Sequence, residues 1–223
     1  MPHDRFIAIR KPKGPTSHDI VDAVRRITGE RRVGHAGTLD PMASGVLVIG
    51  IGREATKHLA TIVGHEKEYV ARVRLGATST TDDAEGLVSE SVNQGSVNQA
   101  SIERVLPKFI GRITQTPPVY SAVKVRGKPA HRRVRGGEMV ELQPRTVDIR
   151  AIDIIAYSWP SLEIRVTCGP GVYIRALARD IGQALGVGGY LTALERTRVG
   201  TYTLADALTL TAFAESWNHT HET

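Results

Sequence analysis

The stretch from Gly34 to Leu47, GHAGTLDPMASGVL, constrains the fold of this chain more than any other segment. Its glycines permit backbone angles that are closed to other residues, and the proline after Asp40 prevents a helix from starting there. The apolar run Val46–Ile51 that follows is typical of a buried strand. The segment therefore predicts a loop that presents Asp40 and is anchored at one end in the core. Taken alone, the same pattern also fits a turn in which the Asp bonds to its own backbone.

Alternating apolar residues predict strands elsewhere. Lys67–Leu75 alternates with Tyr69 on the apolar side, and Leu162–Cys168 alternates in the same way. Phe6–Ile9 is expected to be a short strand. Val119–Val125 is expected to be another, which would place Lys124 and Arg126 on one face.

Helical patterns occur at two places. Thr16 and Asp19 form a capping-box pattern before a helix that should end at Gly29. A second helix is predicted after the turn GPGV, with Arg175 in its first turn. The helix dipole disfavours a cation there, so Arg175 has either a carboxylate or phosphate partner or an exposed, unpaired position. Strands and helices in one main domain follow from these patterns.

The charge of the chain favours a polyanionic partner without naming one. Lys and Arg number 29 against 23 Asp and Glu, a formal net charge of +6. Basic residues crowd into one short segment: Lys124, Arg126, Lys128, Arg132, Arg133 and Arg135, with His131 among them. Such a cluster fits contacts to several phosphates, and it equally fits a solvated face.

Cysteine usage and hydropathy restrict the remaining classes. Cys168 is the single cysteine, which rules out an intramolecular disulfide, and no Cys/His cluster has the spacing of a zinc site. No apolar run is long enough for a signal peptide or a membrane span. We expect a soluble cytoplasmic protein without a structural metal.

Collinear motifs along almost the whole chain resemble those of the TruB family of tRNA pseudouridine synthases. The matching stretches are KPKGPTS from Lys11, GHAGTLDP from Gly34, KEYVARVRLG from Lys67, TDDAEG from Thr81, TPPVYSAVKVRGK from Thr116 and GVYIRALARDIG from Gly171. The resemblance implies isomerisation of a uridine, position 55 in the T-loop of tRNA, to pseudouridine without a cofactor. It also implies an α+β pseudouridine synthase fold, a mixed and largely antiparallel central sheet flanked by helices, with the active cleft across its middle. Residues 1–210 would form the catalytic domain, and 211–223 a short tail without the RNA-binding PUA domain that many members append.

The resemblance also implies roles for single residues. Asp40 would be the catalytic residue, and Arg175 would pair with it and keep it ionised, which suits a nucleophile. Tyr69 would stack on the target base, and Leu194, in LERTRVG, would be an apolar wall that keeps water out. Attack on C1′ and base elimination assisted by Asp40 both remain open. The base that removes the C5 proton would be Tyr69 or a water.

RNA contacts follow from the need to flip the uridine out of the folded T-loop. His35, in the GH pair, would pack against the disturbed loop, while Lys11 and the basic cluster, Lys124, Arg126, Lys128, Arg132 and Arg133, would contact RNA. We expect a monomer whose partner is the T-arm of tRNA.

The chain departs from the family pattern at Arg10, where Asp is usual, at His131, where Tyr is usual, and in the short C-terminal part. Two other functions remain as alternatives. A non-catalytic RNA-binding or RNA-folding protein would use Asp40 only for structure. A nucleotide-binding enzyme would use GPGVYIR or GIGREATK as a phosphate loop, but neither has the GxxxxGK[ST] spacing.

Overall fold

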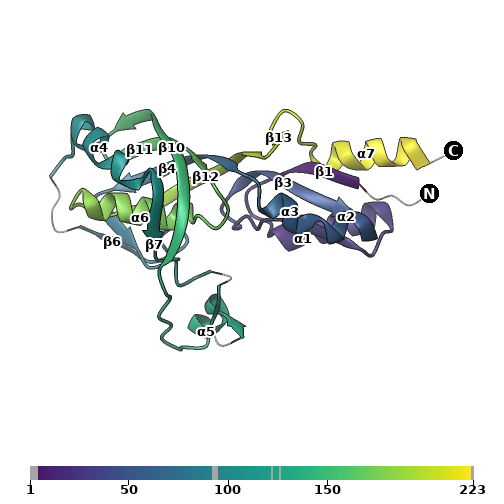
Figure 1. Ribbon diagram of the computed structural model, residues 1–223, viewed down its shortest axis with the longest axis horizontal. Coiled ribbons are helices and arrows are strands. Elements are labelled where there is room, and N and C mark those ends of the chain that lie inside the picture. The colour runs from purple at the N-terminus through teal and green to yellow at the C-terminus, as the bar shows by residue number, and fades with distance from the viewer. Residues whose placement is uncertain (1–4, 92–94, 122, 126, 222–223) are drawn as a thin grey trace. The chain divides into compact units, whose positions relative to one another are not determined.

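The structure, a computed structural model, describes residues 5–91, 95–121, 123–125 and 127–221 (Figure 1). The fold is α+β, with a large mixed and mostly antiparallel sheet, as expected from the sequence. The chain divides into two compact units, Met1–Val70 with Leu194–Thr223, and Ala71–Ala193. Strands β4 (Lys67–Leu75) and β12 (Gly189–Val199) contribute residues to both units. The assignment of residues 1–210 to one catalytic domain stays a prediction.

The first unit consists of short strands and helices in addition to its parts of β4 and β12. They are β1 (Arg5–Lys11), α1 (Ser17–Thr28), β2 (Val33–Ala36), β3 (Ser44–Ile51), α2 (Arg53–Lys57), α3 (Leu59–Val63), β13 (Tyr202–Thr203) and α7 (Leu210–His221). The predicted first strand, the capped helix and the buried strand after the Asp40 loop are confirmed as β1, α1 and β3.

Strand β3 is the centre of the first unit. β1 runs antiparallel along one edge of it. The other edge is shared, because β2 pairs antiparallel with Val48–Ile51 and β12 pairs parallel with Ser44 and Gly45. The loop that carries Asp40 follows the end of β2, at the point where the neighbour of β3 on this edge changes from β2 to β12. The topology therefore places the loop between two strands that both pair with β3.

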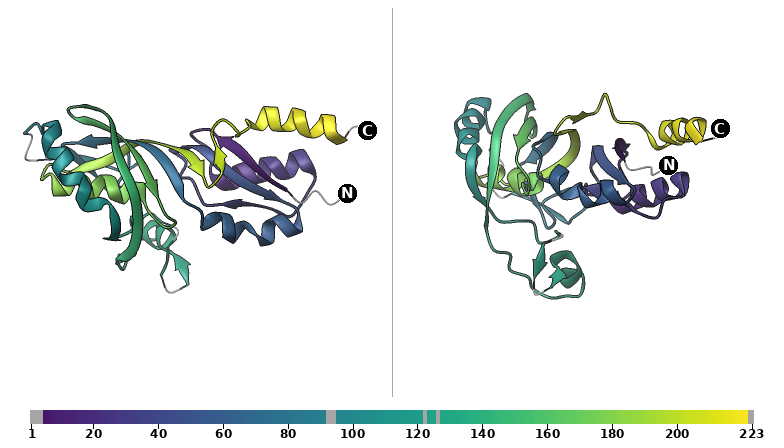
Figure 2. Two further views of the ribbon diagram at one scale, coloured as in Figure 1. Left: turned by 45° about the horizontal axis from the view of Figure 1, so that its top comes forward. Right: turned by 45° about the vertical axis from the view of Figure 1, so that its right-hand side comes forward.

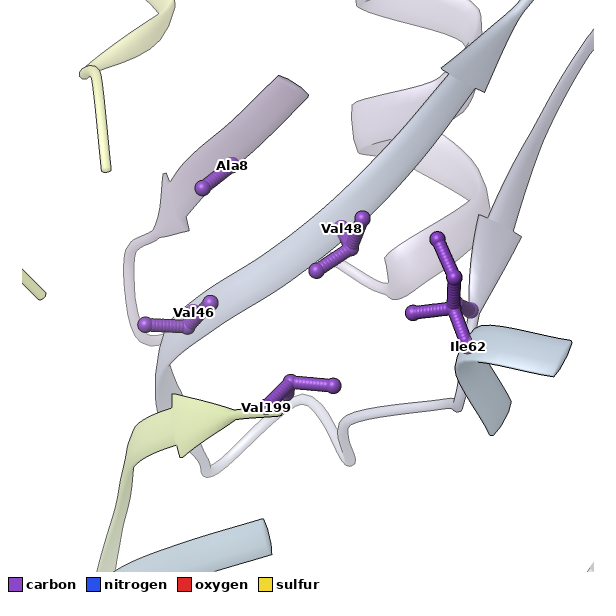
Figure 3. Close-up of a cluster of buried hydrophobic side chains, with 6 residues drawn as sticks. Ala8, Val46, Val48, Ile62 and Val199 are labelled. Atoms are coloured by element: carbon purple, nitrogen blue, oxygen red, sulfur yellow. The ribbon is translucent and has the colours of Figure 1, made fainter. Parts of the chain in front are cut away.

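The core of the first unit explains why β3 is so apolar. One buried cluster, drawn in Figure 3, consists of Ala8, Ala36, Val46, Val48, Ile62 and Val199. These side chains come from the two strands beside β3, from β3 itself, and from α3 and β12. Burying apolar side chains from so many elements contributes most of the stabilisation of such a unit. The loop next to β3 is thus anchored in a packed core.

The termini of α1 follow from its sequence. The Thr16 side chain accepts a hydrogen bond from the Asp19 N–H, and the Asp19 carboxylate accepts one from the Thr16 N–H, which completes the predicted capping box. Gly29 ends the helix with φ 69°, a left-handed conformation that glycine adopts without steric cost. The helix buries Ile20, Val21 and Val24.

The last described segment of the chain forms helix α7, where the sequence predicted only a short tail. It contacts α1 and β1, and Figure 2 shows it alongside β1. Phe213 and Trp217 are its buried residues, with ring centroids 5.7 Å apart. The Arg5 guanidinium lies 4.2 Å from the Trp217 ring centroid, a cation–π contact. Residues 210–221 are therefore part of the packed first unit.

The second unit contains the remaining elements. They are β5 (Ala77–Ser79), β6 (Val88–Glu90), α4 (Gln99–Val105), the 3-10 helix η1 (Leu106–Phe109), β7 (Gly111–Gln115), β8 (Lys124–Val125), β9 (Lys128–Pro129), α5 (Ala130–Arg135), β10 (Arg145–Ser158), β11 (Ser161–Cys168) and α6 (Ile174–Ala184). Its sheet has the order β4-β11-β10-β7, and β10 is antiparallel to both neighbours.

The predicted strands β4 and β11 and the helix α6 are confirmed. In β4 the buried side chains alternate, from Lys67 through Tyr69 to Leu75, and β11 alternates in the same way. In α6 the residues at helical spacing, among them Leu177, Ala178 and Ile181, are buried. The alternation of apolar residues in the two strands and their helical spacing in α6 therefore predicted these elements correctly.

The predicted strand Val119–Val125 was wrong. Residues 116–121 and 123 have no regular secondary structure. Among the described residues of the predicted strand, Lys124–Val125 alone is a strand, and it pairs with the two residues of β9. Pro117 and Pro118 have no N–H to give to a neighbouring strand. Two carbonyls of residues 116–121 accept hydrogen bonds from arginine side chains of α6 and not from a neighbouring strand. Arg179 donates to the Thr116 carbonyl, and Arg175 donates to the Tyr120 carbonyl. An alternating sequence pattern does not show whether a neighbouring strand is available to pair with a segment.

Candidate active site

The loop that holds Asp40 is closed by its own backbone bonds. The Ala43 N–H donates to the Asp40 carbonyl at 3.0 Å, and the Gly14 N–H donates to the Pro41 carbonyl at 2.8 Å. Leu39 on one side of Asp40 is buried, and Asp40 itself is half-buried. Gly37 and Gly45, at the two ends of the loop, have φ of 85° and 107°. The loop is thus a fixed turn in which Asp40 is half-buried.

Three side chains from other elements hold this loop, and the first is Lys11 at the end of β1. Its side chain is 0% exposed, and Nζ donates to the carbonyls of Ala43 at 2.8 Å and Pro12 at 2.9 Å. Pro41 supplies a longer third contact at 3.5 Å. The prediction that Lys11 contacts RNA is not tested, but its ammonium group is bonded to the loop and buried beneath it. The structure favours holding the loop as its role.

The second holding side chain is Arg196 on β12, which is 1% exposed. Its Nε donates to the Val46 carbonyl at 2.8 Å, and one Nη donates to the Gly37 carbonyl at 3.0 Å. These two acceptors lie on either side of the loop, so one guanidinium bridges its entry and its exit. Buried charges are tolerated where such bonds satisfy them. Sequence analysis missed Arg196; its place in LERTRVG was the available signal.

The third is Ser17, the first residue of α1. Its Oγ accepts a hydrogen bond from the Leu39 N–H at 2.8 Å and donates to the Leu39 carbonyl at 3.0 Å. Lys11, Ser17 and Arg196 come from three different elements, so the position of Asp40 depends on the packing of β1, α1 and β12 together. These three residues are called the loop-holding residues below.

Strand β12 gathers further predicted residues around the loop. Leu194, which is buried, directly precedes Glu195 and Arg196, the two residues that pair with Ser44 and Gly45 at the end of the loop. Further along β12, Thr197 donates to the Glu68 carboxylate at 2.7 Å, which places the start of β4 beside it. Buried Tyr69 follows Glu68 directly. The first unit therefore contains Asp40, Tyr69 and Leu194 on neighbouring segments.

His35 lies on β2, opposite Ile49 of β3. Burial lowers the pKa of its imidazole, and the nearby charges of Arg196 and His18 lower it further. Its Nδ1 is buried and has no hydrogen-bond partner among the described residues. The ring is therefore neutral at pH 7, and a neutral imidazole can pack on a nucleobase or a sugar without the cost of desolvating a charge.

Arg175, in the second unit, has the carboxylate partner that its helical position suggested. It is 5% exposed, and one Nη lies 3.3 Å from the Asp83 carboxylate. The guanidinium also donates to the Thr81 carbonyl at 3.1 Å and to the Tyr120 carbonyl at 3.0 Å. The alternative of an exposed, unpaired Arg is wrong. Pairing of Arg175 with Asp40, which the resemblance implied, stays a prediction.

Asp83 is a functional candidate that sequence analysis missed. It is buried, and its Oδ1 accepts from the Thr81 hydroxyl at 2.6 Å and the Glu85 N–H at 3.0 Å. Its Oδ2 faces Arg175. A buried carboxylate with both oxygens engaged is a fixed partner for a guanidinium. The motif TDDAEG was the available signal.

A second arginine of α6, Arg179, binds the same two segments one turn further along. It donates to the Asp82 carboxylate at 2.7 Å and to the Thr116 carbonyl at 2.8 Å, and it also pairs with Asp180. Burial raises the pKa of Asp82, opposed by Arg179, and Asp82 has φ 61°. Arg175 and Arg179 together hold the 81–83 and 116–120 segments on α6.

The N-terminus of α6 is fixed by one buried amide. Gln115, at the end of β7, accepts from the Tyr173 N–H at 2.9 Å and donates to the Tyr173 carbonyl at 3.1 Å. Tyr173 is the N-cap residue and makes no side-chain cap. The position of Arg175, two residues later, is therefore set by β7 as well as by its own acceptors.

The basic cluster lies on the excursion between β7 and β10 that carries α5 (Figure 1). Lys128 is exposed, and Arg133 is half-buried and pairs with Glu138. Lys124 lies in β8 and Arg132 in α5. Arg126 lies outside the described residues. RNA contact by these residues stays a prediction.

Among the described residues, no helix is long and apolar enough to cross a membrane, and no group of three or more potential metal ligands occurs.

Comparison with known proteins shows the family. The sequence model of the TruB family pseudouridylate synthase N-terminal domain matches residues 25–174, and that of the tRNA pseudouridylate synthase B C-terminal domain matches residues 175–223. The chain therefore belongs to the TruB family of pseudouridylate synthases.

Curated relatives named tRNA pseudouridine synthase B are similar over nearly all of the chain. The protein of Thermobifida fusca is 49% identical over 219 residues, which are 95% of this chain and 74% of the relative. The protein of Mycobacterium leprae is also 49% identical, over 94% of this chain and 68% of the relative. The chain thus spans about seven tenths of the length of these relatives.

Solved structures agree on the fold. A chain in the crystal structure of a Cbf5-Nop10-Gar1 complex has a TM-score of 0.76 and 30% identity, over 97% of this chain and 56% of that chain. A chain in the structure of an H/ACA RNP bound to a substrate RNA containing 2'-deoxyuridine has a TM-score of 0.73 and 29% identity, and 54% of it is covered. The present chain therefore spans just over half of each of those chains.

Proposed function

We propose that this chain isomerises uridine to pseudouridine at position 55 in the T-loop of tRNA, with Asp40 as the catalytic residue. Membership in the TruB family and the names of the relatives support the reaction and the tRNA substrate. The single observation that carries the assignment to Asp40 is the loop itself, in which the buried side chains of Lys11, Ser17 and Arg196 fix the backbone around half-buried Asp40.

The reaction needs one well-placed carboxylate and a closed pocket. The N1–C1′ glycosidic bond breaks, the uracil turns, and C1′ is joined to C5. The proton on C5 is lost to water, and N1 takes up a proton in its place. Electrons and atoms balance within the substrate, so neither an oxidant nor a cofactor is consumed. Asp40 serves either by attacking C1′ or by assisting elimination of the base. In both routes the freed uracil must be retained while it turns.

The first unit supplies the surroundings that such a step requires. Tyr69 is proposed to stack on the base, and Leu194 is proposed to form an apolar wall; both side chains are buried. Neutral His35 is proposed to pack against the tRNA loop from which the uridine is flipped. Arg175 is proposed to pair with Asp40, and the positive charge of its guanidinium would keep the Asp40 carboxylate ionised.

The basic cluster is proposed to bind the tRNA backbone. The exposed side chain of Lys128 in β9 and the side chain of Arg133 in α5 are suited to phosphate contacts, which need charge more than exact geometry. The T-arm as the binding site, a monomeric state and action in the cytoplasm also belong to this proposal.

Tritium release tests the proposal directly. Unmodified tRNA transcript carrying tritium at uracil C5 is incubated with the wild type, with Asp40→Asn and with Asp22→Asn. Asp22 is half-buried on α1, with its side chain 42% exposed, and pairs with Arg25, so it is a matched control for the loss of one carboxylate from the same unit. We expect release by the wild type and by Asp22→Asn, and none by Asp40→Asn. Absence of release from the wild type, with tRNA binding intact, would instead favour a non-catalytic RNA-binding protein.

A further inference from the structure

Ser17 makes a contact with the Asp40 loop that differs from those of Lys11 and Arg196. Its side chain is 2% exposed, and its hydroxyl accepts from the Leu39 N–H and donates to the Leu39 carbonyl. A serine hydroxyl has one proton to donate and two lone pairs to accept with, so this proton is committed to Leu39. Both backbone polar groups of the residue before Asp40 are therefore bound by one side chain.

The geometry of a peptide bond transmits this contact to the catalytic residue. The Leu39 carbonyl and the Asp40 nitrogen belong to the same planar unit, which resists twisting. A hydroxyl that fixes the Leu39 carbonyl therefore fixes the direction in which the chain enters Asp40. On the far side, Pro41 has a fixed φ and its carbonyl is held by the Gly14 N–H. Asp40 is thus held from both sides.

Lys11 and Arg196 bond to other parts of the loop backbone. Lys11 bonds most closely to the Ala43 and Pro12 carbonyls, and Arg196 to Gly37 and Val46. Among the three loop-holding residues, Ser17 bonds to the peptide that leads into Asp40. Because it is also the first residue of α1, the loop takes its position from the helix and from the packing of that helix on the core.

We propose that Ser17 is a positioning residue for catalysis, which sets the direction of the Asp40 carboxylate through the Leu39–Asp40 peptide. This inference rests on the proposed function. Ser17 itself touches no reacting atom. Its removal should therefore slow the chemical step and leave tRNA binding unchanged, because misplacement of a reacting group by about 1 Å is enough to cost a rate factor of about 100.

The test compares Ser17→Ala with a matched control at the neighbouring residue. Thr16→Ala removes the N-cap of the same helix, yet Thr16 is exposed and its bonds go to Asp19, away from the loop. Both variants lose one hydroxyl at the start of α1. Single-turnover tritium release with enzyme in excess measures the chemical step, filter retention measures the Kd for tRNA, and thermal unfolding measures stability.

We expect Ser17→Ala to lower the single-turnover rate about 10- to 100-fold with the Kd for tRNA within about twofold of the wild type. Thr16→Ala is expected to lower the melting temperature and to keep the rate within about twofold, because the loop is untouched. A folded Ser17→Ala protein with the wild-type rate would overturn the inference. So would an equal loss of rate in Thr16→Ala, because that would trace the effect to the helix.

A graded substitution keeps the inference testable if Ser17→Ala does not fold. Ser17→Cys retains a weak donor and acceptor of nearly the same shape, so its rate should lie between those of the wild type and the alanine variant. A Ser17→Cys protein that is folded and as fast as the wild type would contradict the inference. If the wild type itself releases no tritium, the proposed function fails, and this outcome is distinct from failure of the role given to Ser17.

Discussion

The Asp40 loop and the basic cluster are two segments that the sequence marks as functional, yet they differ in burial and in how their residues are bonded. Around Asp40, the backbone is bonded to Lys11, Ser17 and Arg196, all three at least 98% buried. Around α5, Lys128 and the residues 136–139 are exposed, and Arg133 has an exposed carboxylate, Glu138, as its partner.

The difference follows from the two functions proposed for these segments, which are reaction with the substrate and binding of the RNA backbone. A carboxylate that reacts at one carbon of a ribose gains rate only if its direction is fixed before the substrate arrives. Charges that neutralise phosphates act over several ångströms and tolerate movement. Substitutions near the loop should therefore change the rate of the chemical step, whereas substitutions in the basic cluster should change affinity and its dependence on salt.

Asp40→Asn should have the largest effect. The amide has nearly the shape of the carboxylate but neither its charge nor its nucleophilicity, so the single-turnover rate should fall by at least about 10³-fold. The Kd for tRNA should stay within about threefold, because binding relies on other groups. Tritium release and filter retention on the same preparations measure both quantities. A variant that binds tRNA but retains more than a tenth of the rate would contradict the role of Asp40.

Arg175 and Asp83 should come next, and they should act as a unit. Arg175→Lys keeps the charge but loses the fork that reaches three acceptors, so we expect a rate about 100-fold lower. Asp83→Asn should lower the rate about 10- to 100-fold. Because each residue acts through the other, the double variant should be little slower than Arg175→Lys.

The control for this pair is Arg72→Lys in the same unit. Arg72 pairs with Glu163 on the surface, where its side chain is 55% exposed, and the rate should be unchanged. Rate losses that simply multiply in the Arg175 and Asp83 double variant would show that the two residues act independently.

The basic cluster should show a moderate effect on affinity alone. Lys128→Gln and Arg133→Gln should each raise the Kd for tRNA about 3- to 10-fold and reduce the slope of log K against log salt by about one. The rate at saturating enzyme should not change. Lys57→Gln, an exposed lysine of α2 paired with Glu54, is the control and should leave the Kd unchanged. A lower rate at saturating enzyme, with no change in the slope of log K against log salt, would show that these residues act in the chemical step and not in tRNA binding.

The smallest effect concerns stability and pH. Burial lowers the pKa of His35 in the folded protein, so below its unfolded pKa of about 6.5 the unfolded chain binds more protons. Stability from this group is present above that pH and is lost as the pH falls, by at most about 1.4 kcal/mol per pH unit. Denaturant unfolding between pH 7 and 5.5 should show this loss in the wild type and less of it in His35→Gln. The exposed His58→Gln control should behave as the wild type.

Much of the fold was predictable because local patterns carry it. The capping box of Thr16 and Asp19, the apolar run of β3 and the alternation of β4 each specify an element without distant contacts. The expected strand Val119–Val125 failed because alternation does not show whether a partner strand exists. In the structure, Arg175 binds the Tyr120 carbonyl in this segment, and Arg179 binds the Thr116 carbonyl just before it.

The sequence by itself determined the family, the position of Asp40 in a loop and the elements on either side of it, because residue order and period are local properties. Only the tertiary structure decided what holds the loop. Lys11, predicted to contact RNA, is buried beneath it, and Ser17 and Arg196 reach it from a helix and a strand far away in the chain. The same holds for Asp83, the partner of Arg175. A hydrogen bond forms between atoms that are close in space, and the packing of the elements, which no local pattern states, brings these atoms together.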